Sequence, residues 1–540
     1  MGGGAEGQPV PSDEVGASDR VLPISTAALL DWPARTFPGR VAIVCGERRI
    51  TFADFDDRIN RLANALLDLG LDDNARVAVL IENSPEAVEV RFAIMKAGLC
   101  MVPLNTRQTV REQTEVVRHS GSACLIASAM WSDRGVELRK ACPCIGHFIS
   151  DGDAPAGVRR YGELLATSSA RSPEVTVSVH ALERIAYTSG TTGSPKGVMR
   201  SFLNFIARLR NDFLNEDHVI DEHDVFLNVA PLTHAARNHV HKYYVKGGTN
   251  IVLDKFDAEE VLTTIERERA TGVMLVPTML ERLLRYERLG AFDTRTLRLI
   301  SVGTAPIPPD VLGEALDRFG PIVRQTYGLT EASQPILVLP PSALRTDDRD
   351  LRERRLASSG RPALGVEVRI VDGAGVEVGP GVVGEIVIRG DVVTPGYWHD
   401  PAATAEVLRD GWLRTGDLAS RDDDGYVYVT DRAKDMIITG GFNVYSREVE
   451  RALEAHPAVR EAAVVGVPDR EWGEAVVAFV VLHAGATVER AELIGHCQER
   501  IAGYKKPRAL HMVTELPRNV QGKVRKPDLR EEAIRLGGMR

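Results

Sequence analysis

The chain has 540 residues, of which 44% are hydrophobic and 26% are charged, a composition that is ordinary for a globular protein. This length exceeds one hydrophobic core, so we expect two or more domains. The formal net charge of −9, with arginines scattered along the chain, argues against a nucleic-acid-binding protein. The best candidate for a membrane span, residues 92–104, is interrupted by Lys96, so we expect no stable membrane insertion.

Residues 1–20 are rich in glycine, proline and acidic side chains, and we expect a disordered leader rather than a signal peptide. The six cysteines of the chain match no zinc pattern and no redox C-x-x-C pair. Reduced thiols are the rule in the cytosol, so the sequence predicts a cytoplasmic protein.

Residues 21–433 alternate short apolar runs with helical periodicity, and we expect them to form one large N-terminal domain. Strands that alternate with helices predict an α/β fold with doubly wound sheets. The expected strands are 77–81, 124–126, 249–253, 273–276 and 299–302, and the expected helices are 85–98 and 258–269.

The pattern changes in the last part of this domain. Residues 341–360 form a charged run, which we interpret as a solvated excursion. Short strands at 366–371, 384–389 and 426–429 are joined by glycine turns, which indicates a small β-barrel-like subdomain.

Residues 434–540 follow a boundary near 431–436 and are long enough for a small α+β C-terminal domain. The expected elements are strands at 436–438, 462–467 and 475–482, helices at 446–455 and 490–501, and a polar, basic loop at 516–530.

Residues 187–197 read YTSGTTGSPKG and are the most informative segment of the chain. Glycine and hydroxyl residues favour turns and local hydrogen bonds, so this run does not suit a regular element. It can present backbone N–H groups, hydroxyls and the Lys196 cation to an anion, as phosphate loops do. Lys196 follows proline and precedes glycine, which differs from the common G-x-x-x-x-G-K-[ST] loop.

Further polar islands flanked by glycine follow at wide intervals, and each alone is a modest signal. They read YGLTE at 327–331, RTGD at 414–417, DRAKDMIITGGFNVYSREVE at 431–450 and PRNVQGKV at 517–524. In this order, and together with the phosphate loop, they closely resemble the adenylate-forming superfamily over residues 25–535. That superfamily contains acyl- and aryl-CoA synthetases, adenylation domains of peptide synthetases and beetle luciferases, and the pattern is closest to the acyl-CoA synthetases.

The resemblance implies a reaction in two steps. A carboxylic acid is activated with ATP and Mg²⁺ to an acyl-adenylate and pyrophosphate, and the acyl group then passes to the thiol of coenzyme A. The residues that the resemblance assigns to nucleotide binding are Thr188, Ser189, Gly190, Thr191, Thr192, Lys196, Gly303, Ala305, Tyr327, Gly328, Thr330, Asp417, Arg432 and Lys523.

The resemblance also implies individual roles, which agree with the chemistry of the side chains. Tyr327 is expected beside adenine, and Thr330 at the α-phosphate. Glu331 is expected to ligate Mg²⁺, which prefers hard oxygen ligands. Asp417 is expected to accept both ribose hydroxyls, since a carboxylate is an acceptor only. Arg432 is expected to contact the ribose and phosphates.

Lys523 is the main catalytic candidate, and Thr188, Lys196 and Glu331 complete the predicted catalytic set. By resemblance, Lys523 reaches the carboxylate and the α-phosphate, where a cation offsets the repulsion between two anions. A lysine in a basic tail is otherwise a solvated surface residue, but Gly522 before it matches the family motif.

The second step implies a different arrangement of the same parts. The small domain is expected to be mobile and to swing about a hinge at Lys434, which withdraws Lys523 from the site. Gly440 and Gly441 would then line the tunnel for the pantetheine arm of coenzyme A, because glycine has no side chain to block it. A plain glycine turn is the alternative reading, and the two are compatible.

The acid is less well defined than the reaction. The resemblance places His234, Arg237, Val302 and Thr326 at the acyl pocket, with His234 as its gate. Arg237 is either a surface or packing arginine, or the partner of a second polar or anionic group on the acid. None of residues 230–241 is acidic, which argues against an α-amino acid.

Small residues near the pocket, such as Ala235 and Ala236, would admit a bulky or long acid. His239 and His241 are interpreted as structural residues rather than as metal ligands. The sequence therefore favours an acid–CoA ligase for a hydrophobic, non-amino carboxylic acid. The alternatives are an adenylating enzyme that loads the pantetheine of a carrier protein, and a catalytically silent acyl- or nucleotide-binding protein. A homodimer is left open.

Overall fold

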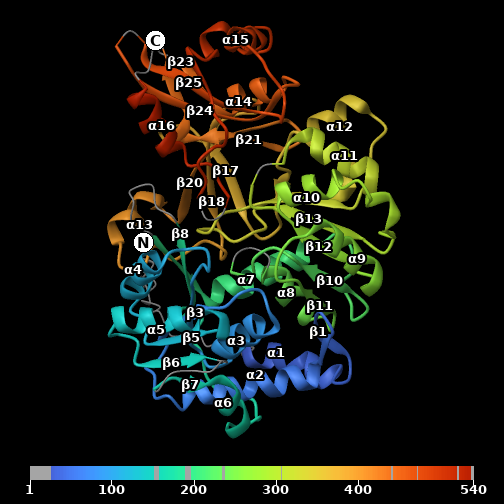
Figure 1. Ribbon diagram of the computed structural model, residues 1–540, viewed down its shortest axis with the longest axis vertical. Coiled ribbons are helices and arrows are strands. Elements are labelled where there is room, and N and C mark those ends of the chain that lie inside the picture. Colours follow the sequence, from blue (N-terminus) through green and yellow to red (C-terminus); the bar gives the residue numbers. More distant parts are fainter. Residues whose placement is uncertain are drawn as a thin grey trace, which may run out of the picture.

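A computed structural model describes residues 26–150, 157–188, 196–233, 237–305, 307–439, 442–470, 472–519 and 522–536. The described chain forms four β-sheets, of nine, seven, five and five strands. The two larger sheets and their helices form a broad body, and the C-terminal strands form a lobe above it (Figure 1). The predicted α/β class, with large sheets followed by a small α+β unit, is confirmed. The predicted leader, residues 1–20, lies outside the described residues.

The first large sheet has the strand order β7-β6-β5-β3-β4-β8-β9, with parallel neighbours except for the antiparallel pair β8–β9. Val77 and Val79 enter one core, and Ala78 and Leu80 enter another. Both faces are therefore buried, which explains the continuous apolar run. The elements are α1 (Thr26–Thr36), α2 (Phe52–Leu67), β3 (Arg76–Leu80), α3 (Pro85–Lys96), β4 (Cys100–Pro103), α4 (Val110–Ser120), β5 (Cys124–Ala127), α5 (Ser132–Ala141), β6 (His147–Ser150), β7 (Arg159–Arg160), α6 (Tyr161–Thr167), β8 (Leu182–Thr188) and β9 (Lys196–Ser201).

The apolar residues 92–104, the best membrane candidate in the sequence, form the end of helix α3 and the strand β4. It begins after Ser84, whose hydroxyl caps the first turn. At its end Lys96 is 1% exposed, and its ammonium donates to Asp56 at 2.7 Å and to Asp31, as a buried charge requires. No helix in the described part of the chain is long and apolar enough to cross a membrane.

The second large sheet has the order β16-β15-β14-β13-β12-β10-β11-β1-β2. Its central strands β10 to β14 are parallel neighbours, and their apolar residues form a separate core. The seven strands and helices predicted up to residue 302 all form, to within two residues at each end. The elements are β1 (Val41–Cys45), β2 (Arg48–Thr51), α7 (Phe202–Leu214), β10 (Val225–Asn228), α8 (Arg237–Tyr244), β11 (Thr249–Val252), α9 (Ala258–Glu268), β12 (Gly272–Leu275), α10 (Pro277–Leu284), β13 (Leu299–Gly303), α11 (Pro309–Phe319), β14 (Val323–Tyr327), β15 (Leu337–Leu339) and β16 (Arg361–Pro362).

The charged run 341–360 is not simply a solvated excursion, so that prediction is corrected. It contains the helix α12 (Arg349–Leu356), which Asp348 caps at its start. Leu344 and Leu356 are buried in the core of the second sheet, and two apolar anchors in a charged run leave no visible periodicity. The predicted small β subdomain follows this run and is a five-stranded antiparallel sheet. Its elements are β17 (Glu367–Val371), β18 (Gly384–Arg389), α13 (Pro401–Val407), β19 (Leu408–Arg409), β20 (Trp412–Arg421) and β21 (Val427–Arg432).

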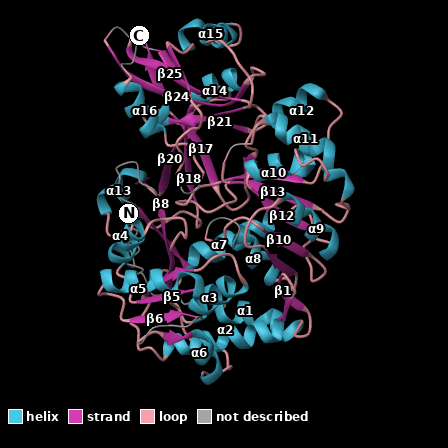
Figure 2. Ribbon diagram, viewed as in Figure 1, coloured by secondary structure: helices cyan, strands magenta, loops and turns pink. Residues whose placement is uncertain are grey.

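The C-terminal lobe is a five-stranded sheet with helices beside it (Figure 2). The polar segment 516–530 was predicted as a loop, but α16 begins within it at Lys526. Leu529 and Ala533 lie one turn apart and are buried against the sheet. The elements are β22 (Ile437–Thr439), β23 (Phe442–Val444), α14 (Ser446–Glu454), β24 (Val459–Asp469), β25 (Gly473–Leu482), α15 (Arg490–Gln498), β26 (Ala509–Met512) and α16 (Lys526–Arg535).

Candidate active site

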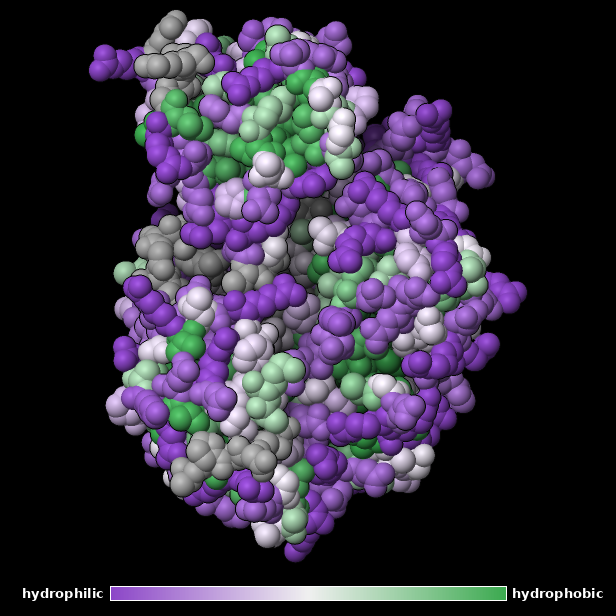
Figure 3. Space-filling model, in the orientation of Figure 1, coloured by the Kyte–Doolittle hydropathy of each residue, from purple (hydrophilic) through white to green (hydrophobic). Residues whose placement is uncertain are grey.

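Several of the predicted site residues lie near the junction between the body and the C-terminal lobe, among them Asp417, Arg432 and Lys523. Figure 1 places the strands β8, β13, β20 and β21 around this junction, and the space-filling view shows a hollow between the two parts (Figure 3). Parallel strands end at one edge of a sheet, so residues that follow several strands can meet there.

The phosphate loop is held by the hairpin of β8 and β9. Thr188, the last residue of β8, and Lys196, the first residue of β9, are direct cross-strand partners. Beside them, the Tyr187 hydroxyl forms a hydrogen bond with Nδ1 of His119 at 2.8 Å. The predicted loop residues between them lie outside the described residues: Ser189, Gly190, Thr191 and Thr192.

Lys196 and Glu331 share one neighbour, Tyr397. The ammonium of Lys196 lies 5.1 Å from the centre of the Tyr397 ring, a cation–π contact. The Tyr397 hydroxyl donates to Oε1 of Glu331 at 2.9 Å. Burial and the carboxylate together raise the pKa of Tyr397, so the hydroxyl keeps its proton and donates. Tyr397 was not predicted from the sequence, although Pro395-Gly396 before it is the kind of turn that marked the other polar islands.

The carboxylate of Asp417 lies between two groups that the sequence assigned to the nucleotide. The Tyr327 hydroxyl donates to Oδ2 at 2.6 Å, and Nε of Arg432 lies 2.6 Å from Oδ1. Asp417 and Arg432 face each other across β20 and β21, which explains their pairing. Each oxygen thus uses one of its two acceptor positions, and the others remain for hydroxyl donors.

The turns after β13 and β14 pack closely. A Cβ at Gly303 would lie 3.0 Å from the Thr326 carbonyl oxygen, and one at Gly328 would lie 2.6 Å from Cγ of Gln334. Thr304 has a positive φ of 75°, a strained conformation that is found at binding sites. Ala305 is exposed and Thr330 half-buried at the same edge.

Lys523 comes from the C-terminal lobe on a tight turn. Its backbone N–H donates to Oδ1 of Asn519 at 2.9 Å, and Gly522 before it has φ of 81°. The surrounding protein lowers the pKa of Lys523, Arg432 lowers it further, and Asp417 and Glu331 oppose the change. Charge interactions weaken with distance, so the ammonium lies within the range of the charges of Arg432, Asp417 and Glu331. The side chain still reaches solvent.

Lys434 lies in the short 3-10 turn Ala433–Asp435, between the last strand of the body and the first strand of the lobe. Gly440 and Gly441, predicted for the coenzyme A tunnel, lie outside the described residues. The next residue, Phe442, is 58% exposed, and its ring centre lies 4.8 Å from that of Tyr504.

A contact across this boundary was not predicted. Asp431, at the end of β21, accepts from the Ser446 hydroxyl at 2.7 Å. Ser446 begins α14 of the lobe and also accepts from Lys526, whose ammonium lies 2.7 Å from Glu450. This chain of contacts, the boundary contact, holds the lobe to the last strand of the body. Its members come from three segments, so no local pattern marks them.

The predicted acyl residues divide into three groups. His234 lies outside the described residues, as do Ala235 and Ala236. Val302 is fully buried in the core of the second sheet, and the Thr326 hydroxyl donates to Gln334. Arg237 is 6% exposed, so it is not a surface residue. Nearby, the ring of His239 stacks on Phe226, and the ring of His241 contacts Phe92 and Phe205.

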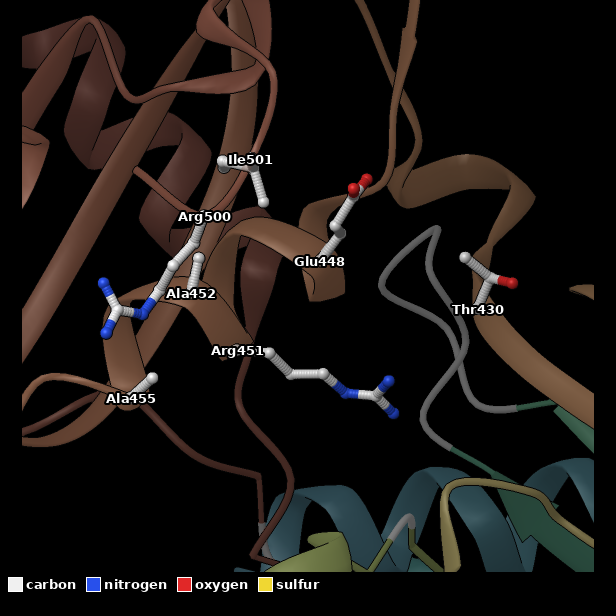
Figure 4. Close-up of a pocket in the computed structure, with 7 residues that line it drawn as sticks. All are labelled: Thr430, Glu448, Arg451, Ala452, Ala455, Arg500 and Ile501. Carbon is white, nitrogen blue, oxygen red and sulfur yellow. The ribbon is translucent and has the colours of Figure 1, made fainter. Parts of the chain in front are cut away.

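A cavity of about 340 Å³ opens between β21 and the C-terminal lobe (Figure 4). It contains none of the predicted site residues, so it is not the predicted acyl pocket. Figure 4 shows the Arg451 side chain extending from α14 beside the strand that carries Thr430. The lining residues are Thr430, Glu448, Arg451, Ala452, Ala455, Arg500 and Ile501.

Comparison with known proteins agrees with this geometry. The family described as AMP-binding enzyme matches residues 30–398, and the AMP-binding enzyme C-terminal domain matches residues 448–523. A feruloyl-CoA synthase of Amycolatopsis sp. is 38% identical, over 92% of this chain and 98% of its own. An indoleacetate–CoA ligase of Aromatoleum aromaticum is 35% identical, over 94% of this chain and 98% of its own.

Two solved structures have the same architecture. The amide bond synthetase McbA from Marinactinospora thermotolerans superimposes with a TM-score of 0.84 and 32% identity, covering 94% of this chain and 99% of its own. The o-succinylbenzoate CoA synthetase of Bacillus subtilis, in complex with its acyl-adenylate, gives 0.81 and 31% identity, covering 93% of this chain and 97% of its own. The predicted family, enzyme class and cofactors are confirmed: the chain belongs to the AMP-binding enzyme family and is an AMP-forming acid–thiol ligase that uses ATP, Mg²⁺ and coenzyme A.

Proposed function

We propose that this acid–CoA ligase activates a non-amino carboxylic acid with an apolar body, and that the junction between body and lobe is its active site. The observation that carries the proposal is the set of contacts at Asp417, which accepts from Tyr327 and pairs with Arg432 at the end of the body. From the lobe, Lys523 is near enough for the charges of Asp417 and Glu331 to act on its pKa.

The residues present suit the charges of the first step. In that step a carboxylate oxygen bonds to the α-phosphorus as the bond from this phosphorus to the pyrophosphate oxygen breaks. Lys523 would offset the repulsion between the carboxylate and the α-phosphate, and Lys196 would hold the phosphates that leave. Both act as fixed charges that require little rearrangement during the reaction.

Glu331 would hold Mg²⁺, which when bound neutralises phosphate charge. The Tyr397 hydroxyl donates to Oε1 of Glu331, which fixes the orientation of the carboxylate. This hydrogen bond does not involve Oε2 of Glu331. Asp417 would position the ribose while Arg432 holds Asp417 in place. These residues therefore fit a magnesium nucleotide in charge and in donor chemistry.

The test is acid-dependent release of pyrophosphate from ATP and Mg²⁺, measured over a panel of carboxylic acids with and without coenzyme A. We expect release with at least one apolar acid and a thioester when coenzyme A is present. Release without any thioester would favour the carrier-protein alternative. The absence of release with every acid would contradict the proposal. The cytoplasmic location and the homodimer stay predictions, which cell fractionation and light scattering would check.

A further inference from the structure

Two arginines face each other inside the body, on the hairpin that holds the phosphate loop. Arg184 on β8 and Arg200 on β9 are direct cross-strand partners. They are only 2% and 7% exposed. Like charges directly opposite each other in a sheet are destabilising, so this pair needs an explanation beyond packing.

Three helices bring further arginines to the same place. Arg91 on α3, Arg208 on α7 and Arg237 on α8 are each at most 6% exposed. Burial lowers the pKa of Arg184, Arg200 and Arg237, the charges of the other arginines lower it further, and Glu183 opposes the change. We call these five residues, Arg91, Arg184, Arg200, Arg208 and Arg237, the arginine cluster.

The carboxylates in contact with the cluster satisfy only part of it. Glu183, 2% exposed, pairs with Arg91 at 2.5 Å, and Asp212 pairs with Arg208. His241 accepts from Arg91 at 3.0 Å, and burial lowers the pKa of this histidine, which keeps it neutral. The two carboxylates thus pair with Arg91 and Arg208, and within the described residues neither forms an ion pair with Arg184 or Arg200.

Hydrogen-bond donors remain unsatisfied in the cluster. Nε and one terminal nitrogen of Arg184 and one terminal nitrogen of Arg208 are buried without a hydrogen-bond partner. The Arg200 side chain has no hydrogen bond or ion pair within the described residues. Arginine keeps its proton in proteins. Buried cations without a counter-ion are strongly unfavourable, so the cluster lacks an anion that would complete it.

The position of the pair relates it to the reacting groups. Thr188 and Lys196 form one cross-strand pair, and Arg184 and Arg200 form another, four residues further along each strand. Residues four apart on a strand share a face and lie about 13 Å apart, at roughly 3.3 Å per residue. Arg237, at the start of α8, directly follows residues 234–236, which were predicted at the acyl pocket.

We propose that the acid carries a second anionic group at its far end, a carboxylate in the simplest case, and that Arg184, Arg200 and Arg237 bind it. The substrate class is then a dicarboxylic acid with an apolar body, whose two carboxylates lie on the order of 10 Å apart. Guanidinium suits this role because it binds carboxylate in a bidentate manner. This inference rests on the proposed function, since it describes the same acid.

The test compares acids that differ only at the far end. Wild-type enzyme is assayed for pyrophosphate release with α,ω-dicarboxylic acids of graded length and with their monomethyl esters. We expect kcat/KM for the preferred diacid to exceed that for its monoester at least about tenfold, because an unpaired buried charge is left when the ester binds. An ester that reacts as well as its diacid would overturn the inference while leaving the ligase function intact. No release with any acid would instead overturn the proposed function.

Variants then separate recognition from packing. In Arg200→Gln, kcat/KM should fall at least about tenfold more for the diacid than for the monoester, and Arg200→Lys should restore part of the difference. Arg210→Gln is the matched control, because Arg210 lies on α7 with its side chain 49% exposed and pairs with Asp391. Equal losses with diacid and monoester in Arg200→Gln would assign Arg200 to packing and contradict the inference.

Discussion

On the nucleotide side of the junction, each buried acid already has a partner. Asp417 lies between Tyr327 and Arg432, and Glu331 accepts from Tyr397. In the arginine cluster, by contrast, the two carboxylates pair with Arg91 and Arg208, and the buried strand pair Arg184 and Arg200 has no ion pair within the described residues. On the nucleotide side, the acids thus have hydrogen-bond or ion-pair partners before the ligand binds, whereas the positive charges of the cluster are not all balanced by carboxylates. Acids that are already paired, such as Asp417 and Glu331, suit a nucleotide that every reaction of this class uses. Buried arginines without a carboxylate partner indicate that the particular substrate supplies an anionic group.

The most severe test of the paired side is Asp417→Asn. The amide can still accept from Tyr327, but it loses the ion pair with Arg432. We expect the KM for ATP to rise about 10- to 100-fold, the range for a charged hydrogen bond, with the preference among acids unchanged. Asp422→Asn is a matched control, since Asp422 also accepts from a tyrosine, Tyr428, away from the site. An equal effect of both changes would show that Asp417 acts through folding.

A smaller effect is expected from Tyr397→Phe. The ring that contacts Lys196 remains, but Glu331 loses its donor. We expect the Mg²⁺ concentration for half-maximal adenylation to rise about tenfold, as for other groups that orient a metal ligand. Tyr286→Phe removes a similar tyrosine–glutamate bond, to Glu259 at the surface, and should change nothing. An unaltered Mg²⁺ requirement would contradict the role given to Glu331.

The smallest effect is expected at the boundary contact. Ser446→Ala removes the hydrogen bond from the Ser446 hydroxyl to Asp431 and leaves the longer one from the Arg447 N–H, at 3.4 Å. The lost bond is worth about 1 kcal/mol. If the lobe must leave this position for the second step, the ratio of thioester formation to adenylation should rise about fivefold. Rates are measured from supplied acyl-adenylate and from pyrophosphate release. Ser342→Ala, which removes a similar bond to Asp217 within the body, is the control. An unchanged ratio would mean that the contact does not bias the lobe.

The sequence was sufficient for the parts of the site that short motifs mark. Lys196, Asp417 and Lys523 each stand in a polar island flanked by glycine, and the order of the islands pointed to the family. Regular strands such as β11 and β13 were also predictable, because their apolar runs are bounded by turn residues.

Residues that act through tertiary contact were not predictable. Arg184 and Arg200 each look like a surface charge in the sequence, and only the register of β8 and β9 makes them a buried pair. Tyr397 likewise gains its meaning from Glu331, which is remote in the chain. Helices α12 and α16 were missed because charged side chains outnumber their one or two buried apolar residues.

The central claim is that Lys523 serves the first half-reaction from the position in which the structure holds it. The most direct measurement compares both half-reactions in wild type and Lys523→Ala, with Arg525→Ala as a control of the same basic segment. We predict that acid-dependent pyrophosphate release falls about 10²- to 10³-fold, while thioester formation from supplied acyl-adenylate and coenzyme A is largely retained. An equal fall in both half-reactions, or no fall in the first, would contradict the account.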